Sequence, residues 1–120
     1  MYNDDPFYKS AKWLDLRESA LRRDKYMCQI SKRYGKMIPA EIVHHIFPRD
    51  KYPEYEYEPW NLISVTLKEH NRLHDRNTDE LADAGIELLR RTALKNGIPI
   101  PEEYTNGIKR ASKHEQRSRY

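Results

Sequence analysis

The sequence of 120 residues predicts a small α+β domain, in which two short antiparallel strands separated by a long loop are followed by a helix. Three observations predict this class. β-branched residues gather in two short runs at 40–46 and 62–65, a helix-capping pattern begins at Thr66, and apolar residues recur at helical spacing on either side of this segment. We expect one domain, residues 1–104, with the strand–strand–helix core at about 40–76.

The N-terminal part of the chain predicts a helix over 10–24, SAKWLDLRESALRRD. Ser10 is a suitable cap, and Trp13, Leu14, Ala20 and Leu21 recur at steps of three and four residues. The next segment, KYMCQISKRYGKMIP, contains glycine and proline, and it predicts an irregular or hairpin-like link.

The run AEIVHHI at 40–46 predicts the first strand, and Leu62–Val65 predicts the second. The loop between them contains three prolines and the acidic, aromatic stretch YPEYEYEP. Its glutamates would repel phosphate, so we expect a surface loop that points away from nucleic acid or docks a protein partner.

Two helices are predicted after the strands. Thr66 and Glu69 have the spacing of a capping box, and the helix they begin should run to about Arg76. A further helix over 79–96 would be capped by Asn77 or Thr78 and would end at Gly97. Its buried stripe is predicted to be Leu81, Ala84, Leu88 and Leu89.

Charge and composition narrow the class of protein. The net charge is +3, and residues 105–120 carry five cationic side chains against one glutamate, so we expect a basic, disordered tail that suits a polyanion. The mean hydropathy is -1.03, and neither a membrane span nor a signal segment is visible, so we expect a cytoplasmic protein. The single cysteine, Cys28, excludes an internal disulfide and is expected to be a small buried residue.

Four of the five histidines lie within 31 residues, as His44-His45, His70 and His74, with Asn61 between the two pairs. His70 and His74 are four residues apart near a predicted helix N-terminus, where two imidazoles can hold one divalent ion. Neighbouring strand residues point to opposite faces, so one of the adjacent pair can face the metal and the other a water. A histidine with a free nitrogen and a pKa near neutrality suits a general base.

The stretches IVHHIFP, WNLISV and EHNRLH resemble the HNH endonuclease family, whose core is the ββα-metal motif, over about residues 12–76. The resemblance implies hydrolysis of DNA to products with 5′-phosphates, with His45 as general base. It implies that His44, His70 and His74 bind the metal. Asn61 matches a residue that binds the metal in some members and braces the loop and orients the base in others, and here we favour bracing.

The chain departs from the many small members that carry a four-cysteine zinc knuckle. Only Cys28 is present, and Ser31, Thr66 and Glu69 stand at the other knuckle positions. The departure puts a structural zinc in doubt and leaves the predicted catalytic set untouched. We expect helix capping and packing of the flanking helices to replace that zinc.

The predicted cofactor is one divalent metal ion (Zn, Ni, Mn, Co or Mg). A site of three histidines favours a transition metal, whereas a site of His44, Asn61 and waters would tolerate magnesium. Phosphate contacts are expected from Lys68, Arg72 and Arg76 on the helix and from Lys109 and Arg110 in the tail.

Small stand-alone members of this family in tailed phages imply phage DNA processing or packaging and terminase subunits as partners. No membrane partner is expected, and no oligomeric state is indicated. The alternative is a non-catalytic DNA-binding module, or a zinc-binding structural module in which Cys28 joins the histidines, on a degenerate scaffold of this family.

Overall fold

The computed structural model describes residues 5–105, and the chain divides into two compact units between Arg72 and Leu73. The predicted basic tail, including Lys109 and Arg110, lies outside the described residues apart from its first residue. Within residues 5–105, no helix is both long and apolar enough to cross a membrane. The predicted α+β class, with two strands followed by a helix and further helices before and after them in the chain, is confirmed.

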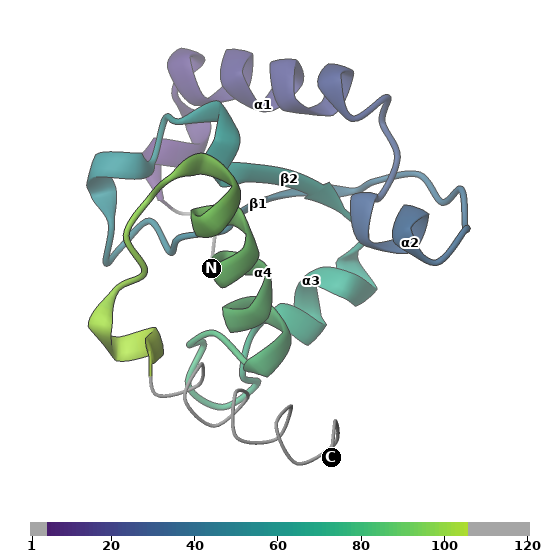
Figure 1. Cartoon of the computed structure of the whole chain (residues 1–120). Coiled ribbons are helices and arrows are strands. Elements are labelled where there is room, and N and C mark those ends of the chain that lie inside the picture. The colour runs from purple at the N-terminus through teal and green to yellow at the C-terminus, as the bar shows by residue number, and fades with distance from the viewer. Residues whose placement is uncertain (1–4, 106–120) are drawn as a thin grey trace. The chain divides into compact units, whose positions relative to one another are not determined.

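The first unit is built on a two-stranded antiparallel sheet (Figure 1). Strand β1 is Ile42–His45 and strand β2 is Leu62–Val65, close to the predicted positions. Val43 pairs with Ser64 and His45 pairs with Leu62. Successive residues of a strand point to opposite faces, so Val43 and His45 share one face of the sheet and His44 lies on the other.

Helix α1, Ala11–Arg23, covers the face that carries Val43 (Figure 1). The side chain of Ser10 accepts a hydrogen bond from the Trp13 amide, which confirms the predicted cap. The core between the helix and the sheet is formed by buried residues of both elements: Trp13, Ala20, Leu21, Val43 and Leu62.

The end of α1 is tied to β2 by polar contacts. The Arg23 guanidinium donates to the carbonyls of Pro59 and Leu62 at 2.8 and 2.7 Å. Asp24 pairs with Arg23 and accepts the Ser64 amide at 3.1 Å. The helix therefore fixes where β2 begins, which also fixes the residue paired with His45.

The link between α1 and β1 contains a short helix, where the sequence predicts an irregular or hairpin-like link. Helix α2, Gln29–Arg33, is capped by Cys28, whose sulfur accepts the Ser31 amide at 3.4 Å. Cys28 is fully buried, as expected. The rest of the link is hairpin-like, with a bridge between Met27 and Pro39. Propensity alone does not reveal a five-residue helix, because its stability comes from its cap and its contacts.

Helix α3, Leu67–Leu73, follows β2 directly. Thr66 caps it, with its hydroxyl accepting the Glu69 amide at 3.1 Å. The Glu69 carboxylate pairs with Arg72 at 2.8 Å. The predicted end at Arg76 is wrong by three residues, because Asp75 accepts the amides of Asn77 and Thr78 and turns the chain.

In the second unit, helix α4 is Asp83–Asn96 and begins four residues later than predicted. Its N-cap is Ala82, so the predicted cap at Asn77 or Thr78 is wrong. Those residues belong to the turn that connects the bridged residues His74 and Leu81. Gly97 ends the helix as expected, in a left-handed conformation with φ 67°.

The second unit packs α4 closely against the chain that follows α3. Leu81, Leu88 and Leu89 are buried as predicted, whereas Ala84 is half-buried. The buried Gly85 takes the close contact instead, because a Cβ there would lie 2.3 Å from the Leu73 carbonyl oxygen. Within residues 5–105, the short 3-10 helices are Pro6–Lys9, Pro53–Tyr55, Pro59–Asn61 and Glu102–Tyr104.

Candidate metal and catalytic site

Two of the histidines meet on the face of the sheet opposite α1. His44 lies on β1 and His70 on α3, and both are buried, at 2% and 6% exposed. Their ring centroids are 5.3 Å apart at an interplanar angle of 67°. The cap at Thr66 fixes where α3 starts and so places His70 beside the end of β1.

His74 directly follows α3, one helical turn after His70, and is half-buried. One ring nitrogen from each of His44, His70 and His74 lies within 4.8 Å of the others. Histidine nitrogens bind zinc at about 2.0–2.1 Å, so a small closure of these rings would bring all three onto one ion. The donor set therefore fits a divalent transition metal better than magnesium, which prefers oxygen ligands.

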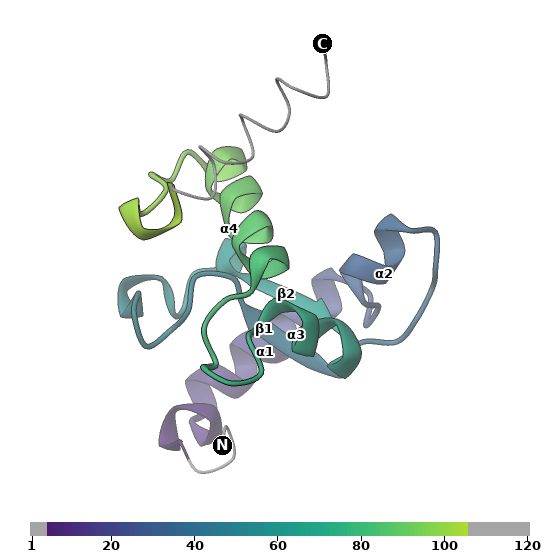
Figure 2. The same ribbon diagram turned by 90° about the horizontal axis from the view of Figure 1, so that it is seen from below.

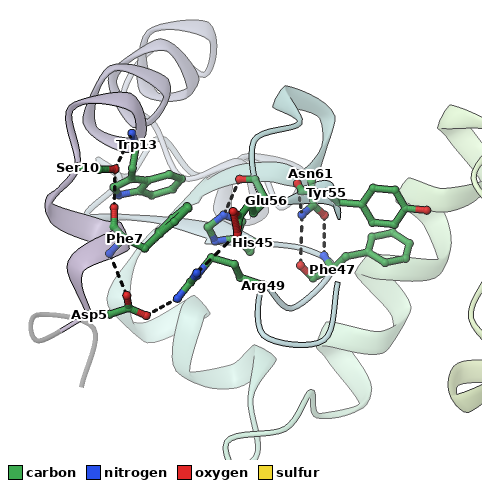
Figure 3. Close-up of polar contacts among 10 residues, drawn as sticks. All are labelled: Asp5, Phe7, Ser10, Trp13, His45, Phe47, Arg49, Tyr55, Glu56 and Asn61. Carbon is green, nitrogen blue, oxygen red and sulfur yellow. Dashed lines mark hydrogen bonds and ion pairs between the residues drawn. The ribbon is translucent and has the colours of Figure 1, made fainter. Parts of the chain in front are cut away.

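His45 lies on the opposite face, within an aromatic cluster. Its ring stacks on Trp13, with centroids 4.9 Å apart at 26°, and also contacts Phe7 at 5.8 Å. Its Nε2 lies 3.0 Å from the Glu56 carbonyl oxygen (Figure 3). A carbonyl only accepts, so Nε2 carries the proton in the neutral ring and Nδ1 keeps its lone pair.

Burial dominates the electrostatics of His45. It lowers the pKa of the imidazole to about 4, with the Glu56 carbonyl acting against the shift and the Arg49 cation adding to it. His45 is therefore neutral at pH 7 and able to accept a proton at Nδ1.

Arg49 holds the loop that carries Glu56. Its guanidinium pairs with Asp5, lies 3.6 Å from the Glu56 carboxylate and sits 4.1 Å above the Phe7 ring (Figure 3). This network could not be predicted from the sequence, because its charged members are far apart in the chain and each looks like an ordinary surface charge. The proline-rich YPEYEYEP loop, which contains Glu56, was the one feature of the sequence that pointed to this network.

Asn61 is fully buried, and both ends of its amide bind the backbone. Oδ1 accepts the Phe47 amide at 2.6 Å, while Nδ2 donates to the carbonyls of Phe47 and Tyr55 at 3.2 and 3.1 Å. These contacts join the start of the long loop, its middle and the residue that precedes β2 (Figure 3). The same loop supplies the Glu56 carbonyl to His45.

In the described part of the chain, the side chains predicted to bind phosphate do not form a cluster like that of the histidines. Lys68 and Arg76 are exposed, and Arg72 is exposed but paired with Glu69. In the acidic loop, Glu54 and Glu58 are exposed as expected. Tyr52 and Tyr55 instead pack on Phe47, with ring centroids 5.5 and 5.1 Å away.

Comparison with known proteins identifies the family of the chain. A scan against protein-family models finds no match, and a search of curated proteins finds none. Among solved structures, the chain is similar to the HNH endonuclease of the deep-sea thermophilic bacteriophage GVE2, crystallised with a manganese ion. The two are 34% identical, with a TM-score of 0.54, over 56% of this chain and 73% of that one. With its strand–strand–helix core and this likeness to a solved member, the chain belongs to the HNH endonuclease family.

Proposed function

We propose that this protein is a metal-dependent endonuclease that hydrolyses DNA phosphodiester bonds. The observation that carries the proposal is that the two adjacent histidines at the end of β1 lie in different environments. His44 joins His70 and His74 in a cluster that fits one cation, while the adjacent His45 stands apart with a nitrogen able to accept a proton. The likeness to a phage HNH endonuclease supports the same reaction class.

In the proposed reaction, His45 Nδ1 removes a proton from the water that attacks phosphorus. The Glu56 carbonyl keeps the other ring proton in place and orients the imidazole. Burial keeps His45 neutral, and the negative charge of a bound phosphate would raise its pKa towards neutrality and make it a stronger base. The expected products carry 5′-phosphate and 3′-hydroxyl ends.

His44, His70 and His74 would hold the ion in this proposal. A bound divalent cation would supply Lewis-acid stabilisation of charge on a non-bridging oxygen and on the leaving 3′ oxygen. Three imidazoles favour zinc, nickel, cobalt or manganese. Asn61 would act as a brace for the loop, since its amide is already committed to the backbone of Phe47 and Tyr55.

The test is a nicking assay on supercoiled plasmid with a panel of divalent metals. We expect cleavage with a transition metal, and a loss of at least about 100-fold in rate for His45→Ala, since a general base typically contributes 10²–10⁴-fold. Asn71→Ala, an exposed change on α3, is the matched control and should cleave normally. Absence of cleavage with every metal would favour the non-catalytic module, and normal cleavage by His45→Ala would remove the proposed base.

The biological role, the partners and the location of the protein stay predictions. Phage DNA processing, a terminase partner and a cytoplasmic location are expectations from the resemblance and the composition. Terminase binding in particular has no support from the described residues or the comparisons.

A further inference from the structure

A second concentration of positive charge in the sequence lies within the described residues. Residues 25–40 contain four cations, Lys25, Lys32, Arg33 and Lys36, and no aspartate or glutamate. Every residue from Lys32 to Pro39 is exposed. We name Lys32–Ile38, which ends α2 and leads towards β1, the basic loop.

The basic loop also presents large apolar side chains to solvent. Tyr34 is 73% exposed and Met37 is 67% exposed. A buried role does not explain them, because the core of the first unit is formed by other residues. Exposed aromatic and apolar groups among cations are the combination that binds nucleic acid, with cations on phosphates and apolar groups on sugars and bases.

The backbone of the loop is held at its base. The Cys28 amide donates to the Ile38 carbonyl at 2.7 Å, and the Lys36 amide donates to the Ser31 carbonyl at 3.0 Å. Gly35 makes the turn at φ 76°, with open space around it. In Figure 2, α2 and the loop project from the edge of the sheet, so the loop is a preformed projection whose tip is accessible.

We propose that the basic loop docks on duplex DNA next to the cleavage site, with Lys32 and Lys36 on phosphates and Tyr34 and Met37 packed on the groove surface. This inference rests on the proposed function. His44 is seven positions after Met37, so their Cα atoms are at most about 25 Å apart. That distance is shorter than one turn of duplex, about 34 Å, so one DNA molecule can touch both.

Charge decides in favour of DNA over a protein partner. Lysines are depleted at protein–protein interfaces relative to the rest of the surface, whereas a stretch of four cations without a carboxylate complements a phosphate backbone. Lys68, at the start of α3, adds an exposed cation in the same unit.

The test measures binding separately from cleavage, with the full chain, a fluorescent 20-base-pair duplex and EDTA, by anisotropy at several salt concentrations. We expect Lys32→Gln/Lys36→Gln to raise Kd about tenfold and to reduce the slope of log K against log salt by about 1.8, or 0.9 per lost phosphate contact. Tyr34→Ala/Met37→Ala removes apolar contact with the groove surface and no phosphate contact, so it should raise Kd about five- to tenfold with the slope unchanged.

The matched control is Arg91→Gln/Lys95→Gln, which removes two exposed cations from α4. Its Kd and salt slope should differ little from those of the wild type. Loop variants with wild-type Kd and slope would overturn the docking proposal. A change in oligomeric state with unchanged DNA binding would also overturn it, and would assign the loop to a protein partner.

The two proposals fail separately in this design. If the wild-type protein binds DNA through the loop but does not cleave DNA with any of the metals, the nuclease proposal falls and the docking proposal stands. If it cleaves and the loop variants bind normally, only the docking proposal falls. The substitutions in the binding test are all at exposed positions, and thermal melting of each variant verifies that it is folded.

Discussion

Asn61 holds both backbone polar groups of Phe47, accepting the amide at 2.6 Å and donating to the carbonyl at 3.2 Å. The same Nδ2 also reaches the Tyr55 carbonyl at 3.1 Å. One buried side chain thus closes the long loop between the strands, and the backbone of that loop touches His45 through Glu56. If Asn61 braces the loop and does not bind the metal, its replacement should change stability and leave metal affinity little altered.

Replacement of Asn61 by alanine should therefore lower stability more than metal affinity. The variant leaves the Phe47 amide and two carbonyls buried without their partner, so the free energy of unfolding should fall by about 3 kcal/mol in urea titrations. Zinc affinity of the folded variant, by calorimetry, should stay close to that of the wild type. A fall in affinity as large as that of a histidine variant would make Asn61 a ligand.

Removal of one imidazole from the cluster should show directly in metal binding. His70→Ala takes away a buried nitrogen donor, and we expect zinc or nickel affinity to fall by at least about 100-fold, beyond the 10–100-fold typical of outer-shell changes. Asn71→Ala on the exposed side of α3 serves as the comparison and should bind as the wild type does. Equal affinities for the two variants would exclude His70 from the site.

The pKa of His45 makes the stability of the metal-free protein depend on pH. The folded-state pKa of about 4 is below the ordinary 6.5, so between these values the unfolded chain binds the proton and the folded chain does not. The contribution is fully present above about pH 6.5 and is lost as pH falls towards 4, by about 1.4 kcal/mol per unit and about 3 kcal/mol in total.

His45→Gln isolates this effect, since an amide can still donate to the Glu56 carbonyl but does not titrate in this range. Urea unfolding in EDTA at several pH values should show the stability of the wild type falling relative to that of the variant as the solution is acidified. Parallel stability curves from pH 7 to pH 4 would mean that the folded imidazole keeps its ordinary pKa.

Gly85→Ala should destabilise the second unit although alanine favours helices. The added Cβ would lie 2.3 Å from the Leu73 carbonyl oxygen and 2.9 Å from Leu81 Cδ2. The backbone must move, and such overpacking outweighs the gain in helix propensity of about 1 kcal/mol, leaving a net loss of about 1–3 kcal/mol. Thermal unfolding measures this loss, with Lys95→Ala on the exposed face of α4 expected to be neutral; a stabilised Gly85→Ala would contradict the close packing.

Local chemistry explains which elements could be predicted from the sequence. The strands, the caps at Ser10 and Thr66 and the stop at Gly97 depend on residues within a few positions of one another, and all are present in the structure. Helix α2 and the start of α4 were mispredicted, because Cys28 is an uncommon cap and Asp75 captures the amides that would otherwise precede a helix.

The candidate site divides in the same way. Strand alternation and helical spacing indicate that one of His44 and His45 can meet His70 and His74, and only the resemblance to the HNH family selects His44, the one found in the cluster. The surroundings of His45 could not be predicted, since Trp13, Arg49 and Glu56 meet only when three separate segments fold together. Exposure of the basic loop was also invisible, because the sequence does not say which cations project.

The adjacency of His44 and His45 makes strand register a functional variable. A slip of one residue in the pairing of β1 with β2, or a single-residue insertion before His44, would turn each imidazole to the other side of the ribbon. The side of the sheet that carries His70 would then receive the His45 ring, and the aromatic cluster around Trp13 would receive the His44 ring. Insertions and deletions should consequently be tolerated far better in the long loop between the strands than within the four residues of β1.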